Sequence, residues 1–433
     1  MMNARRVSSW LIIGLLGAIL ILGAGAEEHD GFLIKDGRKL FPLGFYELPE
    51  SEEGLKAMAD AGVNLVRCRS RADLDRLHAL GMQGVMPLPF QKGATDDLRA
   101  KVAGLVDHPA LAVWEGPDEV VWNFTAYSGL YRTKGVHETR GAWWSQAPEA
   151  KAYAAEQAAT VIPNMREAVA MIRDLDEANR PVWINEAKRS DVYYVRQYLD
   201  YTDITGCDYY PVSARGRNIA AIAGATERWN QVGRGMPVFM VLQAFSWHEL
   251  GGRHEGKGVA YPTFEESRFM AYDAIAHGAE GILYWGSHYL QSDSCRQAIY
   301  AVTSELAALQ PFLTAPEAPG TRLEVVEAPE PGKTPHVASL ARNVNDDWLV
   351  VLVNEDDERH MGVVVEGLDA LNGKTMYRLY TDDETVVSNG ELIARMQPKD
   401  VQVYATSRDW ETPRRKGRDF GAESEQEPEE ENK

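Results

Sequence analysis

Cysteine is scarce in this sequence, and its spacing fits neither a disulfide framework nor a metal site. The 433 residues include three cysteines, Cys68, Cys207 and Cys295, which lie far apart. An odd and widely spaced set cannot form a disulfide framework, and no Cys-x-x-Cys pair is present. Small disulfide-rich scaffolds and zinc ribbons are therefore excluded, and we expect the three thiols to be buried and unpaired.

Basic residues are also fewer than acidic residues. The chain has 45 Lys and Arg against 64 Asp and Glu, which gives a formal net charge of −19 at pH 7. Nucleic-acid binding needs a basic footprint for the phosphates, so nucleic acid is not an expected partner. The sequence contains neither Gly-x-Gly-x-x-Gly nor a P-loop, which argues against the common nucleotide-binding folds.

Apolar runs long enough to cross a bilayer are missing as well. The run from Trp10 to Leu22 has 13 residues, fewer than the roughly 20 that a spanning helix needs. Two arginines precede it and the small residues Ala24-Gly25-Ala26 follow it, which is the pattern of a secretory signal peptide over residues 1–26. The sequence thus predicts a secreted or periplasmic protein with no stable membrane insertion after signal cleavage. An uncleaved N-terminal anchor is the alternative.

Strand and helix patterns alternate over residues 27–312. Helical stretches with an apolar stripe end at Gly62 and Gly81, each suited to a left-handed C-cap, and an apolar strand follows two or three residues later. Continuous apolar strands separated by helices indicate a parallel sheet covered on both faces. Eight such strands predict a (β/α)₈ TIM barrel of the α/β class. The expected strands are Phe41–Tyr46, Asn64–Cys68, Gly84–Leu88, Ala110–Trp114, Val182–Asn185, Asp203–Cys207, Val238–Leu242 and Gly281–Trp285.

The pattern changes after residue 312. Five prolines between residues 316 and 335 indicate a linker-like stretch, and strands without helices follow it. Alternating apolar residues and turns such as Asn389-Gly390 predict a small all-β sandwich domain within 313–408. A structural cap on the barrel and a carbohydrate-binding module are the two roles considered for it. Residues 409–433 form an acidic tail that is expected to be disordered. The tail carries little of the charge, so the acidity belongs to the folded body.

Carboxylates and aromatic side chains gather where the predicted barrel strands end, and these ends form the catalytic face of such barrels. The fourth strand runs into Glu115, Asp118 and Glu119, and the eighth ends at Trp285. Aromatic faces stack on the C–H groups of sugar rings, while paired acids act on the glycosidic oxygen. The composition of these ends therefore favours carbohydrate chemistry.

These residues resemble the glycoside hydrolases of clan A. In that clan the fourth strand ends in Asn-Glu or Asp-Glu, which Asp118-Glu119 matches, and an aromatic residue such as Trp285 ends the eighth strand. The resemblance covers about residues 31–312 and implies Glu119 as general acid/base, an oligo- or polysaccharide substrate and no cofactor. Two positions depart from the pattern: Val120 replaces a common proline, and Gln243 occupies the seventh-strand position of the nucleophilic Glu.

Because an amide cannot act as nucleophile or base, the second carboxylate must come from elsewhere. Asp208 at the end of the sixth strand is the best placed, while Glu249 and Asp118 are the other candidates. Each has a structural alternative, since Asp118 suits a helix cap and Asp208 suits a hydrogen-bonded strand terminus. We predict Glu119 and Asp208 as the catalytic pair. The expected substrate-binding residues are Tyr46, Asp118, Asn185, Tyr210, Gln243, Trp247, His248, Glu249 and Trp285.

A metal site is not expected. His248 and His254 are six residues apart, whereas the helical zinc motif needs a spacing of four. Two functions therefore compete: a secreted glycoside hydrolase, and a carbohydrate-binding pseudoenzyme that has lost its second catalytic group at Gln243. A carboxylate of Asp208, Glu249 or Asp118 facing Glu119 across a pocket would favour the hydrolase.

Overall fold

The computed structural model describes residues 30–129, 136, 141–251, 258–326 and 336–413. The predicted signal at 1–26, His254 and most of the predicted tail lie outside the described residues. Within the described part of the chain, no helix combines the length and apolarity that a membrane crossing requires.

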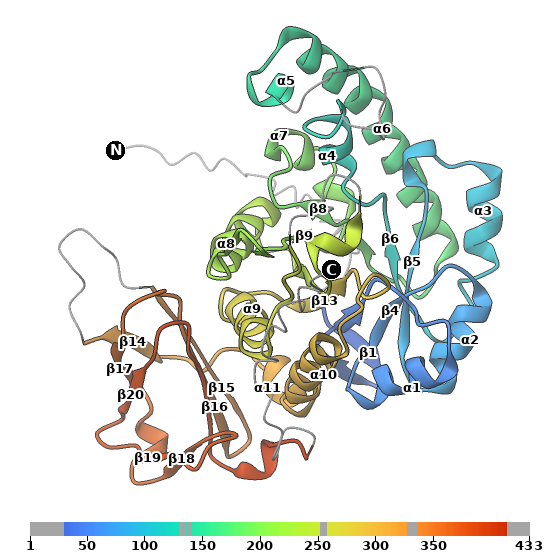
Figure 1. Ribbon diagram of the computed structural model, residues 1–433. Helices are drawn as coiled ribbons and strands as arrows, with labels where there is room; N and C mark the ends of the chain where they lie inside the picture. Colours follow the sequence, from blue (N-terminus) through green and yellow to red (C-terminus); the bar gives the residue numbers. More distant parts are fainter. Residues whose placement is uncertain (1–29, 130–135, 137–140, 252–257, 327–335, 414–433) are drawn as a thin grey trace, which may run out of the picture.

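Eight parallel strands close into a barrel, as Figure 1 shows. Neighbours along the chain are neighbours in the barrel, and the last strand pairs with the first through Leu283 and Gly44. The fifth strand is interrupted: its first half pairs with the fourth strand and its second half with the sixth. The predicted fold class is confirmed. In order, the strands are β3 (Leu43–Phe45), β4 (Leu65–Arg67), β5 (Gln83–Pro87), β6 (Leu111–Glu115), β7 (Val182–Trp183) with β8 (Glu186–Ala187), β9 (Thr205–Asp208), β12 (Val238–Gln243) and β13 (Gly281–Trp285).

Helices surround the barrel because one face of each is apolar and the strands are buried on both sides. Ser51 and Ser70 cap the first two helices with their hydroxyls. Gly62 and Gly81 follow these helices with φ of 84° and 71°, the left-handed conformation that the sequence predicts there. The outer helices are α1 (Glu52–Asp60), α2 (Arg71–Ala79), α3 (Asp96–Ala103), α6 (Pro148–Leu175), α7 (Val192–Val195), α8 (Ala221–Gly233), α9 (Phe264–Ala276) and α10 (Asp293–Ala308).

Several short strands and helices are added to the barrel. A hairpin of β1 (Leu33–Lys35) and β2 (Arg38–Leu40) precedes it. Helices α4 (Val120–Phe124) and α5 (Gly141–Trp144) follow the fourth strand, and the pair β10 (Val212–Ser213) and β11 (Gly216–Arg217) follows the sixth. All of these except the hairpin follow carboxyl ends of strands, where they shape the catalytic face.

The C-terminal domain consists of two antiparallel sheets around a separate small core. One sheet contains β14 (Arg322–Val325), β17 (Met361–Glu366) and β20 (Leu392–Met396). The other contains β15 (Val337–Val344), β16 (Asp347–Asn354), β21 (Val401–Ala405), β18 (Thr375–Arg378) and β19 (Glu384–Val386). The sequence pattern predicts strands at 337–342, 348–353, 361–365, 375–380, 391–396 and 400–405, but not β14 or β19, which are edge strands with alternating exposed residues.

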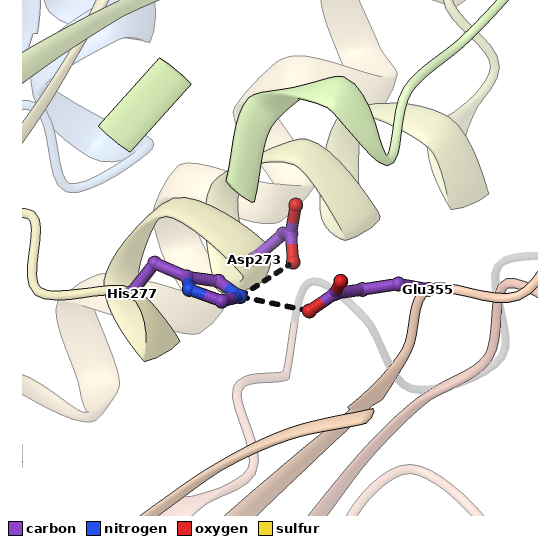
Figure 2. A group of neighbouring side chains, drawn as sticks. All are labelled: Asp273, His277 and Glu355. Carbon is purple, nitrogen blue, oxygen red and sulfur yellow. Dashed lines mark hydrogen bonds and ion pairs between the residues drawn. The ribbon is translucent and has the colours of Figure 1, made fainter. Parts of the chain in front are cut away.

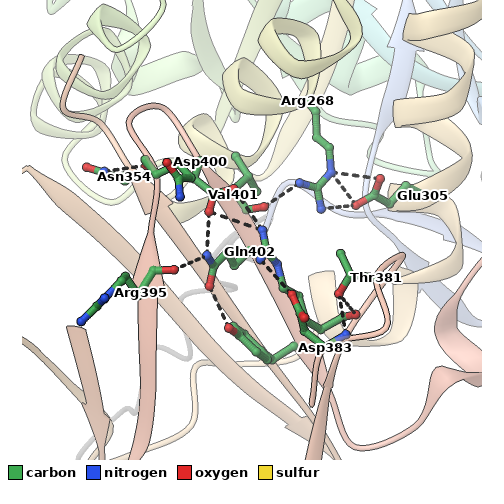
Figure 3. Close-up of polar contacts among 12 residues, drawn as sticks. Arg268, Glu305, Asn354, Thr381, Asp383, Arg395, Asp400, Val401 and Gln402 are labelled. Carbon is green, nitrogen blue, oxygen red and sulfur yellow. Dashed lines mark hydrogen bonds and ion pairs between the residues drawn. The ribbon is translucent and has the colours of Figure 1, made fainter. Parts of the chain in front are cut away.

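Besides this separate core, one face of the larger antiparallel sheet packs into the hydrophobic core of the barrel domain. Leu349 and Val351 of β16 belong to the same buried cluster as the residues of α9 and α10. Across this boundary Arg268 of α9 donates to Glu305 of α10 at 2.7 Å and to the carbonyl oxygen of Val401 at 2.8 Å (Figure 3). The sandwich is therefore fixed against the outer helices rather than tethered by a linker alone, as the orange and red segments of Figure 1 show.

Candidate active site

Glu119 and Asp208 form a hydrogen-bonded pair of carboxyl groups at the mouth of the barrel. Enclosure within the protein, the charges of Asp208 and Asp118, and the hydrogen bond to Asp208 raise the pKa of Glu119 well above its usual range. Enclosure and the charge of Asp118 raise the pKa of Asp208 to about 7, against hydrogen bonds from Glu119 and Tyr210 that lower it. Near neutral pH the shared proton therefore belongs to Glu119, and Asp208 accepts from it.

The backbone holds Glu119 in an uncommon conformation. Its φ of 51° lies in the left-handed region, which non-glycine residues adopt rarely and at a cost in free energy. The Glu119 N–H donates to the carbonyl oxygen of Asn185 at 2.9 Å. Helix α4 begins at the next residue, and the buried Glu186 carboxylate accepts its Val121 and Trp122 N–H groups. Glu186, on the fifth strand, thus positions the chain that carries Glu119.

A second charged pair lies beside the acids. Arg67, at the end of β4, donates from Nε to Glu115 Oε2 at 2.6 Å, and its guanidinium lies 5.0 Å from the centre of the Tyr46 ring. Glu115 is fully buried, and burial raises its pKa to about 7 even though Arg67 lowers it. Tyr46 is also close enough to Asp118 and Asp208 for their charges to raise its pKa further above the usual range. The sequence analysis did not select Arg67, because a lone arginine in an apolar strand carries no motif.

The side chains of Asp118 and Asn185 are hydrogen-bonded to each other. Asn185 Nδ2 donates to Asp118 Oδ1 at 3.0 Å, which joins the loop after the fourth strand to the fifth strand. The alternative that the Asp118 side chain caps the following helix is wrong, because Glu119 is the N-cap residue and no side chain hydrogen-bonds there. Asp118 is instead part of the polar cluster that surrounds the acid pair.

Aromatic rings form one wall of the site. The rings of Trp285 and Tyr210 stack with centroids 5.4 Å apart, and Phe245 packs edge-on against Trp285 at 5.0 Å. Trp247 lies 5.2 Å from Phe245. The Tyr210 hydroxyl donates to Asp208 Oδ2 at 3.3 Å, so this wall reaches the acid pair.

Glu47 fixes the loop that follows Trp285. Its carboxylate accepts the N–H groups of Gly286 and Ser287 at 3.1 and 3.0 Å and the Ser287 hydroxyl at 2.8 Å. His288 lies 3.2 Å from the same carboxylate. Nothing in the sequence distinguishes Glu47 from other surface acids, so its function in holding this loop follows from the tertiary structure alone.

The polar atoms of the Gln243 side chain all hydrogen-bond to backbone groups. Its Nε2 donates to the carbonyl oxygens of Val212 and Phe245, both at 2.9 Å, and its Oε1 accepts the Val212 N–H at 2.9 Å. The side chain is fully buried. Gln243 therefore ties the seventh strand to the loop after the sixth, and it uses both the donor and the acceptor of its amide to do so.

Replacing Gln243 by Glu is expected to destabilise the protein without adding activity. The substitution places a carboxylate against two carbonyl oxygens and removes two donors, which costs at least about 2 kcal/mol of unfolding free energy. Urea unfolding measures the loss. The exposed Gln197 provides a matched Gln→Glu control, for which a change within about 0.5 kcal/mol is expected. Unchanged stability of the Gln243 variant would contradict this structural function.

Glu249 and His248 lie in the loop after the seventh strand. Glu249 accepts the N–H groups of Ser246 and Gln291 at 2.8 and 2.6 Å and the Tyr261 hydroxyl at 2.7 Å. These three hydrogen bonds tie the Glu249 carboxylate to the loop after the seventh strand and to the segment around Gln291. His248 lies in the same capped turn, and its Nδ1 is buried without a hydrogen-bond partner among the described residues.

Several polar atoms around the acid pair lack a protein partner. Within the described part of the chain, Tyr46 Oη, Glu115 Oε1 and Asn185 Oδ1 are buried and make no hydrogen bond. Unpaired buried polar groups are costly, so their concentration here suits a ligand with several hydroxyl groups. A cavity of about 900 Å³ is lined by Tyr46, Arg67 and Trp285, among others, whereas Glu115 and Asn185 are not among its lining residues. Glu119 and Asp208 lie beyond these side chains rather than in the cavity wall.

The acid pair makes stability depend on pH in a defined direction. Unfolded Asp and Glu titrate near pH 4, whereas Asp208 titrates at about 7 in the folded protein and Glu119 is also raised. Between these values the folded state binds more protons, so the free energy of unfolding falls as pH rises from about 4 to about 7.

Asp208→Asn is expected to flatten this dependence. The other buried acids are the same in the wild type and the variant. Their contributions to the pH dependence of the unfolding free energy therefore cancel when the two proteins are compared. The variant should gain on the order of 1–2 kcal/mol over the wild type between pH 5 and pH 8. Urea unfolding at several pH values measures this difference in unfolding free energy, and Glu265→Gln, at an exposed position, is the control. A constant difference across this range would show that the two carboxyl groups do not share a proton.

Comparisons with known proteins give the fold a context. No protein-family model matches the sequence, and no curated protein matches it significantly. Among solved structures, a protein described as a glycoside hydrolase is similar over 87% of this chain and 95% of its own, with 13% identity and a TM-score of 0.50. A GH30 endoxylanase from Clostridium papyrosolvens matches over 85% and 96%, with 12% identity and a TM-score of 0.47.

A β-galactosidase from the psychrophilic Marinomonas ef1 matches over 62% of this chain with 14% identity and a TM-score of 0.41, and the present chain spans only 60% of its length. At these identities the likeness concerns the fold alone. The closed parallel barrel, its helices and the added all-β domain together establish that this chain has the (β/α)₈ fold found in solved glycoside hydrolases.

Proposed function

We propose that this protein is a secreted or periplasmic glycoside hydrolase in which Glu119 is the general acid/base and Asp208 is the second catalytic carboxylate. The observation that carries the proposal is the position of these two carboxyl groups beside each other, largely enclosed, at the carboxyl ends of the barrel strands. A glycosidase needs one protonated and one ionised carboxyl group on either side of the glycosidic bond. The raised pKa of Glu119 provides the protonated one near neutral pH.

The separation of the two groups favours retention of configuration. Inverting enzymes need roughly 6.5–9.5 Å between their carboxyl groups for a water molecule, whereas retaining enzymes have about 5–5.5 Å. Glu119 and Asp208 are close enough to hydrogen-bond to each other, which is closer than in either class. A bound sugar must therefore part the two groups, and the retaining separation needs the smaller movement. In the proposed first step, Asp208 attacks the anomeric carbon while the Glu119 proton moves to the leaving oxygen. In the second step, Glu119 accepts a proton from water as water releases the sugar from Asp208.

The surrounding residues support a sugar ligand. The stacked rings of Trp285 and Tyr210 offer an apolar face for the C–H groups of a sugar ring. The unpaired atoms of Tyr46, Glu115 and Asn185 match the hydroxyl groups of such a ligand. We therefore propose an oligo- or polysaccharide substrate bound between these two sets of side chains.

A screen with aryl glycosides of different sugars, followed by oligosaccharides of the sugar that reacts, tests this function. Product formation recorded by proton NMR before mutarotation identifies the first anomer released. We expect retention; release of the inverted anomer would contradict the two-step mechanism. Binding of oligosaccharides without any hydrolysis would instead favour the carbohydrate-binding pseudoenzyme. Recovery of the protein from the periplasm or medium, rather than the cytoplasm, tests its location.

A further inference from the structure

A second cluster of ionisable side chains lies at the boundary between the barrel and the sandwich (Figure 2). Asp273 and His277 are four residues apart along α9, so they project from the same face of the helix. Glu355 comes from the sandwich, directly after β16. His277 Nε2 lies 2.7 Å from Glu355 Oε1 and 3.8 Å from Asp273 Oδ1. The three side chains thus converge from two domains on one point.

Asp273 provides an independent indication that this point accommodates a ligand. Its side chain is fully buried, and its Oδ2 accepts the Ala223 N–H at 2.9 Å. No group in the described part of the chain hydrogen-bonds its Oδ1, and 3.8 Å to His277 Nε2 is too long for a hydrogen bond. A buried carboxylate oxygen that faces two other ligand-type atoms and accepts no hydrogen bond is costly, unless it takes up a proton or binds a cation.

The distances between the ligand atoms of these three side chains suit a small divalent ion. Ligand atoms about 2.0–2.1 Å from a tetrahedral Zn²⁺ lie roughly 3.3–3.4 Å from one another. The two distances from His277 Nε2, 2.7 and 3.8 Å, lie on either side of that value. All three ligand atoms lie within 4.8 Å of one another, so small side-chain rotations suffice to place them around one ion.

The other nitrogen of His277 already has the partner that metal-binding histidines have. Glu227 Oε1 of α8 lies 3.0 Å from His277 Nδ1. A carboxylate that accepts the proton of one ring nitrogen orients the ring and leaves the other nitrogen free for a metal. Glu227 therefore supplies the outer carboxylate of a carboxylate–histidine–metal arrangement.

The excess of carboxyl groups around His277 also favours the binding of a cation. The charged groups that act on His277 are the carboxylates of Asp273, Glu355 and Glu227. With all three carboxyl groups ionised, one imidazolium offsets one negative charge, whereas a divalent ion offsets two. His336, whose Nδ1 lies 4.0 Å from Glu355 Oε2, is a further group beside this cluster that can carry positive charge. A cation at this point thus removes much of the repulsion between carboxylates that the packing of the two domains brings together.

We propose that Asp273, His277 and Glu355 bind a divalent transition-metal ion, with Zn²⁺ as the representative case and water in the fourth position. The sequence analysis did not expect a metal, because the three ligands are distant along the chain and form no motif. His277 ends α9 just before β13 begins, so the site lies at the amino ends of the barrel strands, on the opposite face from Glu119. The ion accordingly fastens the sandwich to the barrel and takes no part in sugar chemistry.

Titration of the chelator-treated full-length protein with Zn²⁺ in a calorimeter tests this proposal. We expect one high-affinity site in the wild type and a loss of more than tenfold in affinity for Glu355→Gln, which keeps the size and a hydrogen bond to His277 but removes the charged ligand. Glu227→Gln is expected to weaken binding by about 10–100-fold, because it alters only the outer partner. Glu358→Gln, an exposed acid three residues from Glu355, is the matched control and should bind like the wild type.

Co²⁺ provides a spectroscopic readout that does not depend on stability. Intense visible absorption bands, as expected for tetrahedral Co²⁺, should appear with the wild type and the Glu358 control and be lost with Glu355→Gln. Absence of Zn²⁺ binding by the wild type would overturn the proposal. Equal affinity of the Glu355→Gln and wild-type proteins would overturn it as well, because the ion would then be bound elsewhere.

Discussion

Replacing Glu119 by Gln is expected to slow hydrolysis of glycosides with poor leaving groups by about 10²–10⁴-fold, the usual contribution of general acid catalysis. The amide keeps the shape of the side chain but cannot protonate the leaving oxygen. Aryl glycosides with strongly acidic phenols need no such proton, so the first step with these substrates should be nearly unaffected. The measurement is kcat/KM across a series of phenols of different acidity, and the variant should depend more steeply on phenol acidity than the wild type.

Asp208→Asn tests the proposed nucleophile separately from the general acid, Glu119. Without its carboxylate no glycosyl–enzyme ester forms, so activity should fall with good and poor leaving groups alike. Glu265→Gln, at the exposed start of α9, controls for the loss of a negative charge and should match the wild type. If both site variants lose activity equally on every substrate, or if Glu119→Gln loses none, Glu119 is not the general acid.

Breaking the buried ion pair at the domain boundary should produce the largest loss of stability. Arg268 and Glu305 are almost completely buried, and Glu305 also accepts the Tyr272 hydroxyl at 2.9 Å. Arg268→Met leaves the Glu305 carboxylate buried without its cation and removes the contact to Val401, which costs about 3–5 kcal/mol. Urea unfolding followed by tryptophan fluorescence measures the loss.

Two comparisons isolate the buried charge as the cause. The double variant Arg268→Met with Glu305→Leu removes both charges, so it should recover much of the stability lost by the single variant. Arg322→Met breaks the exposed pair with Glu366 and should cost no more than about 1 kcal/mol. Equal losses at the buried and exposed pairs would show that burial does not set the energy of the Arg268 pair.

The order of the strands was predictable because the relevant signal is local. An apolar strand and an apolar helical stripe are encoded by neighbours along the chain, and Gly62 and Gly81 mark the helix ends by their conformational freedom. The edge strands β14 and β19 were missed because alternating exposed residues carry a weak signal. The three thiols are buried and unpaired, as the cysteine count indicated.

The catalytic face could be located from the sequence, but its contacts could not. Residues at the carboxyl ends of parallel strands meet at one end of a barrel, which was enough to select Glu119, Asp208 and Trp285. Which of these side chains touch depends on strand stagger and loop path, which are set by packing between distant segments. For this reason the hydrogen bonds of Gln243 and Glu249 to backbone N–H groups could not be predicted from their positions in the sequence.

The sequence by itself determined the barrel, the added β-domain and the residues at the strand ends, because periodicity and strand order are properties of short segments. The tertiary structure was needed to show that Glu119 and Asp208 lie side by side and that burial and the charge of Asp118 raise the pKa of both groups. It also decided that Glu355 of one domain meets Asp273 and His277 of the other. Hydrogen bonds and charges act over a few ångströms, and those distances are fixed only when the whole chain is packed.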